Sequence, residues 1–144
     1  MKRVSGTCVS IDGHGVLLRG PSGCGKSDLA LRLIEDGAFL IADDYTEMEV
    51  RDARLTAAAP AAIRGMIEVR GLGILRMDPL DEVQLSVIID LVPASEVPRM
   101  PDAVDTQILG VALPLFKLVS FEPSAPAKVR LAVRLSTGGI ISVS

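Results

Sequence analysis

The chain has 144 residues, of which 49% are hydrophobic and 23% charged, and its formal net charge is −3. This length suits one domain with its own core, predicted over residues 1–144, and the acidic balance argues against nucleic-acid binding. No apolar run approaches the roughly 18 residues of a membrane-spanning helix, there is no signal-peptide core and the two cysteines make no disulfide framework. We therefore expect a cytoplasmic protein that does not associate with membranes. Aromatic residues make up only 3%, which disfavours a base-stacking platform.

The first elements in the chain are two predicted strands joined by a tight turn. Residues Gly6 to Ile11 suit a strand, and the apolar run Val16 to Leu18 suits a buried one. Between them, Asp12-Gly13 is a dipeptide typical of two-residue hairpin turns. His14, the one histidine, falls in this turn, where a solvated residue is the simpler interpretation than a catalytic one.

A glycine-rich loop follows the second strand and fits the phosphate-binding pattern G-x-x-x-x-G-K-[ST] at every fixed position. A predicted helix from Ser27 to Asp36 follows the loop, and Gly37 ends it. Glycines let backbone N–H groups approach phosphate oxygens, and the helix N-terminus adds positive potential. The loop therefore predicts an ATP site with Mg²⁺, in which Lys26 binds phosphate and the Ser27 hydroxyl binds the metal. The predicted nucleotide-binding residues are Gly20, Pro21, Ser22, Gly23, Cys24, Gly25, Lys26 and Ser27.

Two adjacent acids, Asp43 and Asp44, end the next predicted strand, the apolar run Phe39 to Ala42. We expect this strand to be fully buried and the acids to face the phosphates, since α/β sheets bind ligands beyond the carboxyl ends of strands. Neighbouring strand residues point to opposite sides, so the two acids should differ in role. One carboxylate could hold Mg²⁺ through water or accept a proton. The alternative is a merely hydrophilic strand end.

The rest of the chain is predicted to be richer in strand than in helix. We expect a loop with three prolines and a tail that frays at residues 136–144. The predicted strands are Tyr45–Val50, Met66–Arg70, Ile74–Met77 and Val83–Val92, the loop is Pro93–Pro101, and the last helix is Ala127–Leu135. The sequence thus indicates an α/β nucleotide-binding domain with mixed, strand-rich sheets.

Three motifs in order resemble the catalytic domain of bacterial HPr kinase/phosphorylase: the phosphate loop, Leu40-Ile-Ala-Asp-Asp44, and Ile67-Glu-Val-Arg-Gly-Leu-Gly-Ile74. The resemblance runs from about Val4 to about Leu135. It implies a fold similar to phosphoenolpyruvate carboxykinase and ATP-dependent phosphorylation of a serine of HPr, the phosphocarrier of the sugar phosphotransferase system. It also implies removal of that phosphate by inorganic phosphate, and self-association, because longer relatives form hexamers.

The resemblance also implies roles for single residues. Lys26 and Ser27 match the phosphate-loop lysine and the magnesium-binding hydroxyl, and Glu68 matches a second magnesium ligand. Asp44 matches the general base of phosphorylation and the general acid of the reverse reaction. Arg99 matches a catalytic arginine. The segment Pro126-Ala-Lys-Val-Arg130 resembles the part of the family associated with dephosphorylation.

The chain departs from the family pattern at Ser5, where the family usually has a histidine that interacts with the catalytic aspartate. The sequence also shows neither the N-terminal domain of longer members nor the C-terminal helix that helps hold HPr, and short proteobacterial members similarly lack the first domain. Two alternatives stay open beside an HPr kinase. The chain could be a kinase of the same fold that acts on another hydroxyl, or a nucleotide-sensing module with little catalysis.

Overall fold

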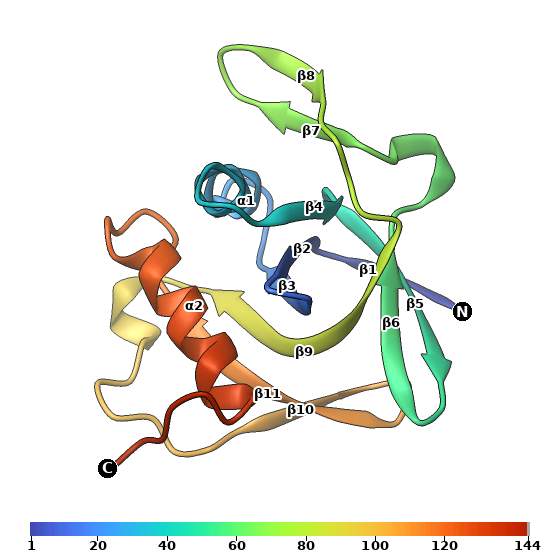
Figure 1. Ribbon diagram of the computed structural model, residues 1–144. Coiled ribbons are helices and arrows are strands. Elements are labelled where there is room, and N and C mark those ends of the chain that lie inside the picture. The colour runs from blue at the N-terminus through green and yellow to red at the C-terminus, as the bar shows by residue number, and fades with distance from the viewer. Residues whose placement is uncertain (144) are drawn as a thin grey trace.

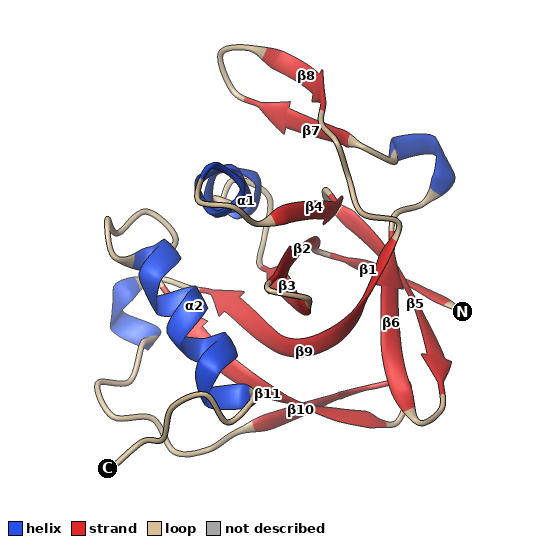
Figure 2. Cartoon of the chain, viewed as in Figure 1, coloured by secondary structure: helices blue, strands red, loops and turns tan. Residues whose placement is uncertain are grey.

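The computed structural model describes residues 1–143 and shows a mixed α/β fold that is rich in strands (Figure 2). The helices are α1 (Lys26–Glu35) and α2 (Ala125–Ser136), with short 3₁₀ turns η1 (Ala61–Ile63) and η2 (Ala94–Glu96). No helix within residues 1–143 is long and apolar enough to span a bilayer. The strands are β1 (Lys2–Ser5), β2 (Thr7–Ile11), β3 (His14–Arg19), β4 (Phe39–Ala42), β5 (Tyr45–Arg51), β6 (Arg54–Ala58), β7 (Met66–Val69), β8 (Gly73–Arg76), β9 (Glu82–Leu91), β10 (Asp105–Ile108) and β11 (Val111–Leu118).

The centre of the fold is a mixed sheet in which β11, β9, β3, β2 and β4 lie side by side in that order. Strand β9 is parallel to both β3 and β11, whereas β2 is antiparallel to both of its neighbours. Consequently β3, β4, β9 and β11 run in one direction, and the loops that follow them lie together at the carboxyl ends of these strands. We call this end of the sheet the loop edge, and it is where α/β sheets bind ligands.

The long strand β9 connects this central sheet to a second layer made of β6, β5 and β1 (Figure 1). Its first residues pair with β6 in antiparallel register, with Gln84 opposite Thr56. Its later residues pair with β3 in parallel register, with Ile88 opposite Leu17. The β7–β8 hairpin is a separate two-stranded sheet that lies beyond α1 and β4 in the same view.

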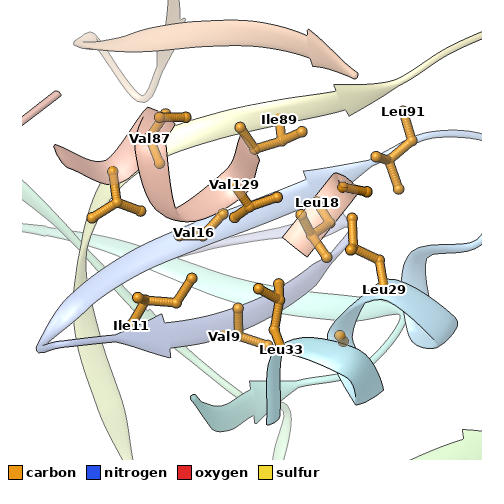
Figure 3. Close-up of a cluster of buried hydrophobic side chains, with 14 of the residues drawn as sticks. Val9, Ile11, Val16, Leu18, Leu29, Leu33, Val87, Ile89, Leu91 and Val129 are labelled. Atoms are coloured by element: carbon orange, nitrogen blue, oxygen red, sulfur yellow. The ribbon is translucent and has the colours of Figure 1, made fainter. Parts of the chain in front are cut away.

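Two apolar clusters cover the two faces of the central sheet, which explains why its strands are continuous apolar runs. In β3, Val16 and Leu18 point to the face covered by α1 and α2, and Leu17 points to the other face. All three side chains are fully buried. Figure 3 shows the first cluster, where Leu29 and Leu33 of α1 pack onto the sheet. This packing fixes α1, and with it the glycine loop, against the loop edge.

Most elements predicted from the sequence are confirmed within two or three residues. The helix predicted over Ser27–Asp36 is α1, and the one predicted over Ala127–Leu135 is α2. The Asp12-Gly13 turn is confirmed, since both residues have positive φ angles (51° and 81°) between the paired residues Ile11 and His14. The strand-rich α/β class is therefore correct.

The structure differs from the sequence analysis in several places, among them β1 and β6, which were not predicted. The strand Phe39–Ala42 is not fully buried, because the Phe39 side chain at its start is 49% exposed. The β10–β11 hairpin was not predicted. Its turn uses Leu109 and Gly110 at φ angles of 50° and 79°, and leucine is not one of the residues that normally mark such a turn. A proline inside β11, Pro114, further hides the strand.

The C-terminal tail forms neither helix nor strand over residues 137–143. The amides of Gly139 and Ile140 donate to the Arg134 carbonyl oxygen at 2.7 and 3.3 Å, which ends α2. Ser144 lies outside the described residues, and fraying of the 136–144 tail stays a prediction.

Candidate functional site

The glycine loop joins β3 to α1 at the middle of the loop edge. Gly25 caps α1 with a φ of 96°, and its carbonyl oxygen accepts the first helical bond from the Leu29 amide at 2.9 Å. A Cβ atom at Gly25 would lie 2.5 Å from Ser120 Oγ and 2.8 Å from Phe121 Cζ. Only glycine fits this backbone angle and this space, so the last glycine of the motif is required by packing as well as by conformation.

Lys26 lies at the centre of the loop, with only 8% of the residue exposed. Its ammonium donates to the carbonyl oxygens of Gly20 at 2.8 Å and Pro21 at 3.3 Å, and lies 3.9 Å from Cys24 Sγ. The loop thus wraps around its own lysine. This arrangement places a cation and the N-terminus of α1 at the same point, which suits a bound anion.

Asp43 connects three elements around the start of α1. The residue is only 6% exposed. Its Oδ1 accepts from the hydroxyls of Ser27 at 2.6 Å and Thr7 at 3.0 Å, and its Oδ2 accepts from the Glu68 amide at 3.1 Å. The structure therefore brings the Ser27 hydroxyl and the Glu68 backbone amide to opposite oxygens of one carboxylate. The sequence analysis expected both Asp43 and Asp44 to face the phosphates and gave the role of base to Asp44, without assigning one to Asp43.

Asp44 has a different environment from its neighbour, as expected, but for a different reason. The two acids lie in a bend between β4 and β5 rather than on a strand, and Asp44 has a φ of 63°. Its amide donates to Thr7 Oγ1 at 3.1 Å, and its carbonyl oxygen accepts from the Gly6 amide at 2.7 Å. The residue is exposed, and within residues 1–143 its carboxylate makes no hydrogen bond or ion pair.

Ser5 and Thr7 approach the acids from the N-terminal strands. Ser5, which the resemblance matches to the family's histidine, ends β1 opposite Tyr45, the residue after Asp44. Thr7 donates to Asp43 and accepts from Asp44, and it holds the bend in place. The sequence analysis missed Thr7, although a hydroxyl among the apolar residues of β2 is a signal that could have found it.

Glu68 lies on β7, in the hairpin above α1 and β4 (Figure 1). Its amide donates to Asp43, and the residue is exposed. The donor set suits a hard cation. The Ser27 hydroxyl donates its proton to Asp43, so the lone pairs of its oxygen can coordinate a cation. The carboxylate of Asp43 lies beside it. The residues present therefore fit an Mg²⁺ ion.

Arg99 is not brought into contact with these residues. It is exposed in the loop between β9 and β10, and it has no hydrogen bond or ion pair within the described part of the chain. The loop does start at the loop edge, because β9 ends there beside β3. The dephosphorylation-like segment lies in the first turns of α2, where Lys128 pairs with Glu122 at 3.2 Å and Arg130 with Asp36 at 2.9 Å.

The loop between β11 and α2 also contacts the glycine loop. The sequence analysis gave no role to its residues. Ser120 donates from its hydroxyl to the Cys24 carbonyl oxygen inside the glycine loop. Arg32 of α1 donates to the carbonyl oxygens of Ser120 and Glu122, and pairs with Asp28 at 2.9 Å. The glycine loop is thus held from both sides, by Asp43 at Ser27 and by this loop at Cys24.

Comparisons with known proteins agree with this architecture. A model of the HPr Serine kinase C-terminal domain family matches residues 1–118, from β1 to the end of β11. The solved HPr(Ser) kinase/phosphatase of Coxiella burnetii superposes with a TM-score of 0.86, covering 96% of this chain and 98% of that one at 24% identity. That likeness supports the strand-rich α/β fold.

Curated relatives are similar in sequence. The HPr kinase/phosphorylase of Limosilactobacillus reuteri (strain DSM 20016) is 38% identical over 125 residues, which cover 78% of this chain and 39% of the relative. That of Caldicellulosiruptor bescii is 49% identical over 71 residues, covering 49% and 23%. The chain thus matches less than half the length of either relative. The family match over most of its residues shows that the chain belongs to the HPr serine kinase C-terminal domain family.

Proposed function

We propose that this domain is an ATP-dependent protein-serine kinase that acts on an HPr-like phosphocarrier and also catalyses the reverse, phosphate-dependent reaction. The observation that supports this best is the Ser27–Asp43–Glu68 connection beside the Lys26 loop. It joins the Ser27 hydroxyl and the backbone of Glu68, beside the glycine loop, through one buried carboxylate. The names of the curated relatives support HPr as the acceptor.

The residues divide the work by their positions. The loop amides and Lys26 bind the phosphates of ATP and offset their charge. Ser27 and Glu68 would hold Mg²⁺, with Asp43 orienting the Ser27 hydroxyl and the Glu68 backbone. When bound, Mg²⁺ supplies positive charge that neutralises the transferring phosphoryl group. Arg99 would add charge from the β9–β10 loop.

Asp44 suits the role of general base better than Asp43 does. Both oxygens of Asp43 already accept hydrogen bonds from three donors, which leaves little capacity for an incoming hydroxyl. The Asp44 carboxylate is exposed and makes no hydrogen bond within residues 1–143. Asp44 takes the serine proton during phosphorylation and returns a proton to the serine oxygen when inorganic phosphate removes the group.

A protein acceptor suits the surface around this edge. The β7–β8 hairpin exposes Leu72 and Ile74 (72% and 69%), and Met100 beside Arg99 is 67% exposed. Exposed apolar side chains of this kind can contribute to protein contacts. Cytoplasmic location, a fold similar to phosphoenolpyruvate carboxykinase, and self-association as in the hexamers of longer relatives belong to the same proposal.

Mass spectrometry of purified HPr incubated with this protein, Mg²⁺ and ATP tests the proposal. We expect HPr to gain the mass of one phosphate on a serine, and to lose it when inorganic phosphate replaces ATP. The Lys26→Ala variant serves as the inactive control. Tight ATP binding without any phosphorylated HPr would favour a nucleotide-sensing module with little catalysis. Phosphorylation of a small hydroxyl compound but not of HPr would favour a kinase that acts on a different acceptor.

A further inference from the structure

Phe121 has an unusual environment for an aromatic residue. Its ring is 64% exposed, although its edge contacts the glycine loop where a Gly25 Cβ would lie 2.8 Å from Phe121 Cζ. Phe116, five residues earlier, instead packs against the core beneath the helices. An aromatic ring normally buries most of its large apolar surface, so the fold itself does not explain this exposed ring.

The backbone of Phe121 is fixed on both sides. The Arg32 guanidinium donates to the carbonyl oxygens of Ser120 and Glu122, the residues immediately before and after Phe121. The Ser120 hydroxyl also donates to the Cys24 carbonyl oxygen of the glycine loop. The exposed ring is therefore held at a defined place beside the phosphate site, which lowers the entropy cost of binding a flat ligand against it.

The order of the strands places this ring at the side of the loop away from the metal ligands. The glycine loop follows β3, the middle strand of β11-β9-β3-β2-β4. Asp43 follows β4, two strands away on one side, and Phe121 follows β11, two strands away on the other. In agreement, α1 contacts β4 and β7 as well as α2 (Figure 1). Because Ser27 and Asp43 mark the γ-phosphate side, the nucleoside must leave the loop in another direction.

We propose that Phe121 is the stacking platform for the purine base of the bound nucleotide. This inference rests on the proposed nucleotide site and extends it to the base. The low aromatic content of the chain argued against a stacking platform in the sequence analysis. Stacking needs only one π-face, however, so a single ring beside the phosphate site is sufficient.

The first test compares two ligands in the Phe121→Ala variant by isothermal titration. ATP and inorganic tripolyphosphate, each with Mg²⁺, share the phosphates, and only ATP has a base. Phe121→Ala should weaken ATP binding by about 5- to 150-fold and leave tripolyphosphate binding within about twofold. Phe39→Ala is the matched control, since Phe39 is also half exposed but starts β4, at the far end of that strand from Asp43. It should change neither affinity.

A second test uses the absence of tryptophan from the chain. Phe121→Trp introduces a single tryptophan at the platform, and stacking of a purine should quench its fluorescence. We expect quenching by ATP and none by tripolyphosphate, and no response from Phe39→Trp with either ligand. Equal loss of both ligands in Phe121→Ala would show that the ring only shapes the loop. If Phe121→Ala leaves the affinity for ATP unchanged, the inference is overturned. If the variant at the same time binds HPr more weakly, the ring belongs to the contact with the acceptor protein.

The two proposals fail in different ways. If the wild-type protein binds neither ATP nor tripolyphosphate, the phosphate site itself is wrong and the platform falls with it. If the wild type binds both, and Lys26→Ala abolishes both, the phosphate site stands. In that case an unquenched Phe121→Trp protein removes only the stacking role of Phe121.

Discussion

The Ser27 hydroxyl donates a hydrogen bond of 2.6 Å to Asp43 Oδ1, which joins the phosphate loop to the bend after β4. The other oxygen of Asp43 accepts from the backbone of Glu68 on β7. One buried carboxylate thus orients the Ser27 hydroxyl and fixes the backbone at Glu68, the two proposed metal-binding residues. Such preorganisation is what electrostatic catalysis requires, because the site needs little rearrangement during the reaction.

Asp43→Asn should lower the free energy of unfolding by about 1–3 kcal/mol. Both Asp43 oxygens accept from protein donors, so in either orientation the new NH₂ group faces a donor. Asp44→Asn is the matched control and should stay within about 0.5 kcal/mol. Urea unfolding of the two variants measures the difference, and equal values would contradict the role given to Asp43.

Asp44→Asn should instead affect the reaction. It keeps the shape of the side chain and removes the basic site, so phosphoryl transfer should fall by about 10²–10⁴-fold while ATP binding is retained. Single-turnover transfer to HPr gives the rate, and titration with ATP gives the affinity. Full activity in Asp44→Asn would assign the proton to another acid, most directly Asp43.

Ser5→His tests the same base from its other side. Ser5 lies opposite Tyr45, beside Asp44, so an imidazole there should change the pH dependence of transfer. The change should disappear in the Asp44→Asn background, because the two groups would act as a unit. Additive effects of the two substitutions would show that they act independently.

Lys26→Ala should remove most of the stabilisation by nucleotide. ATP–Mg²⁺ at about 100 times its Kd should stabilise the wild type by about 2.7 kcal/mol, or very roughly 10 °C in Tm for a domain of this size. The ligand-induced shift is the relevant quantity, because the variant also loses the lysine bonds to Gly20 and Pro21. Equal shifts in both proteins would place the nucleotide elsewhere.

The sequence predicted those parts of the site that depend on neighbouring residues. The glycine loop, the acids after β4 and Glu68 each belong to a short motif, and the structure places Ser27 and Glu68 at one carboxylate. Thr7 and Ser120 were missed because they join the site only through strand order. Periodicity along the chain does not reveal that β2 separates β3 from β4, or that β11 lies beside β9.

Two glycines of the loop separate the cost of a strained backbone angle from the cost of steric overlap with neighbouring atoms. Both have positive φ angles, 82° at Gly23 and 96° at Gly25, but only Gly25 has neighbours within reach of an added Cβ. Gly23→Ala should cost about 1–2 kcal/mol of stability from the backbone alone. Gly25→Ala should cost at least about 1 kcal/mol more from overpacking against Ser120 and Phe121. Chemical denaturation checks the order, and equal costs would contradict the contact.

Cys8 should make the fold sensitive to alkali. Burial raises the pKa of its thiol from 9.0 to about 12. As pH rises above 9 the unfolded chain loses this proton while the folded chain keeps it, so stability falls, by up to about 1.4 kcal/mol per pH unit from this group. Unfolding measured between about pH 8 and pH 11 should show a shallower decline in Cys8→Ala. Identical slopes would mean that other groups cause the decline.

The contact between Ser120 and Cys24 joins residues 96 positions apart, and that between Arg19 and Asp90 joins residues 71 positions apart. During synthesis the glycine loop therefore leaves the ribosome long before the β11–α2 loop, which holds it at Cys24. At about 5–20 residues per second, roughly 5 to 20 s pass before Ser120 is made. A nascent chain that ends before the β11–α2 loop has the whole phosphate motif but lacks one of the two supports of its loop. The glycine loop therefore gains its second support only after the β11–α2 loop has been made.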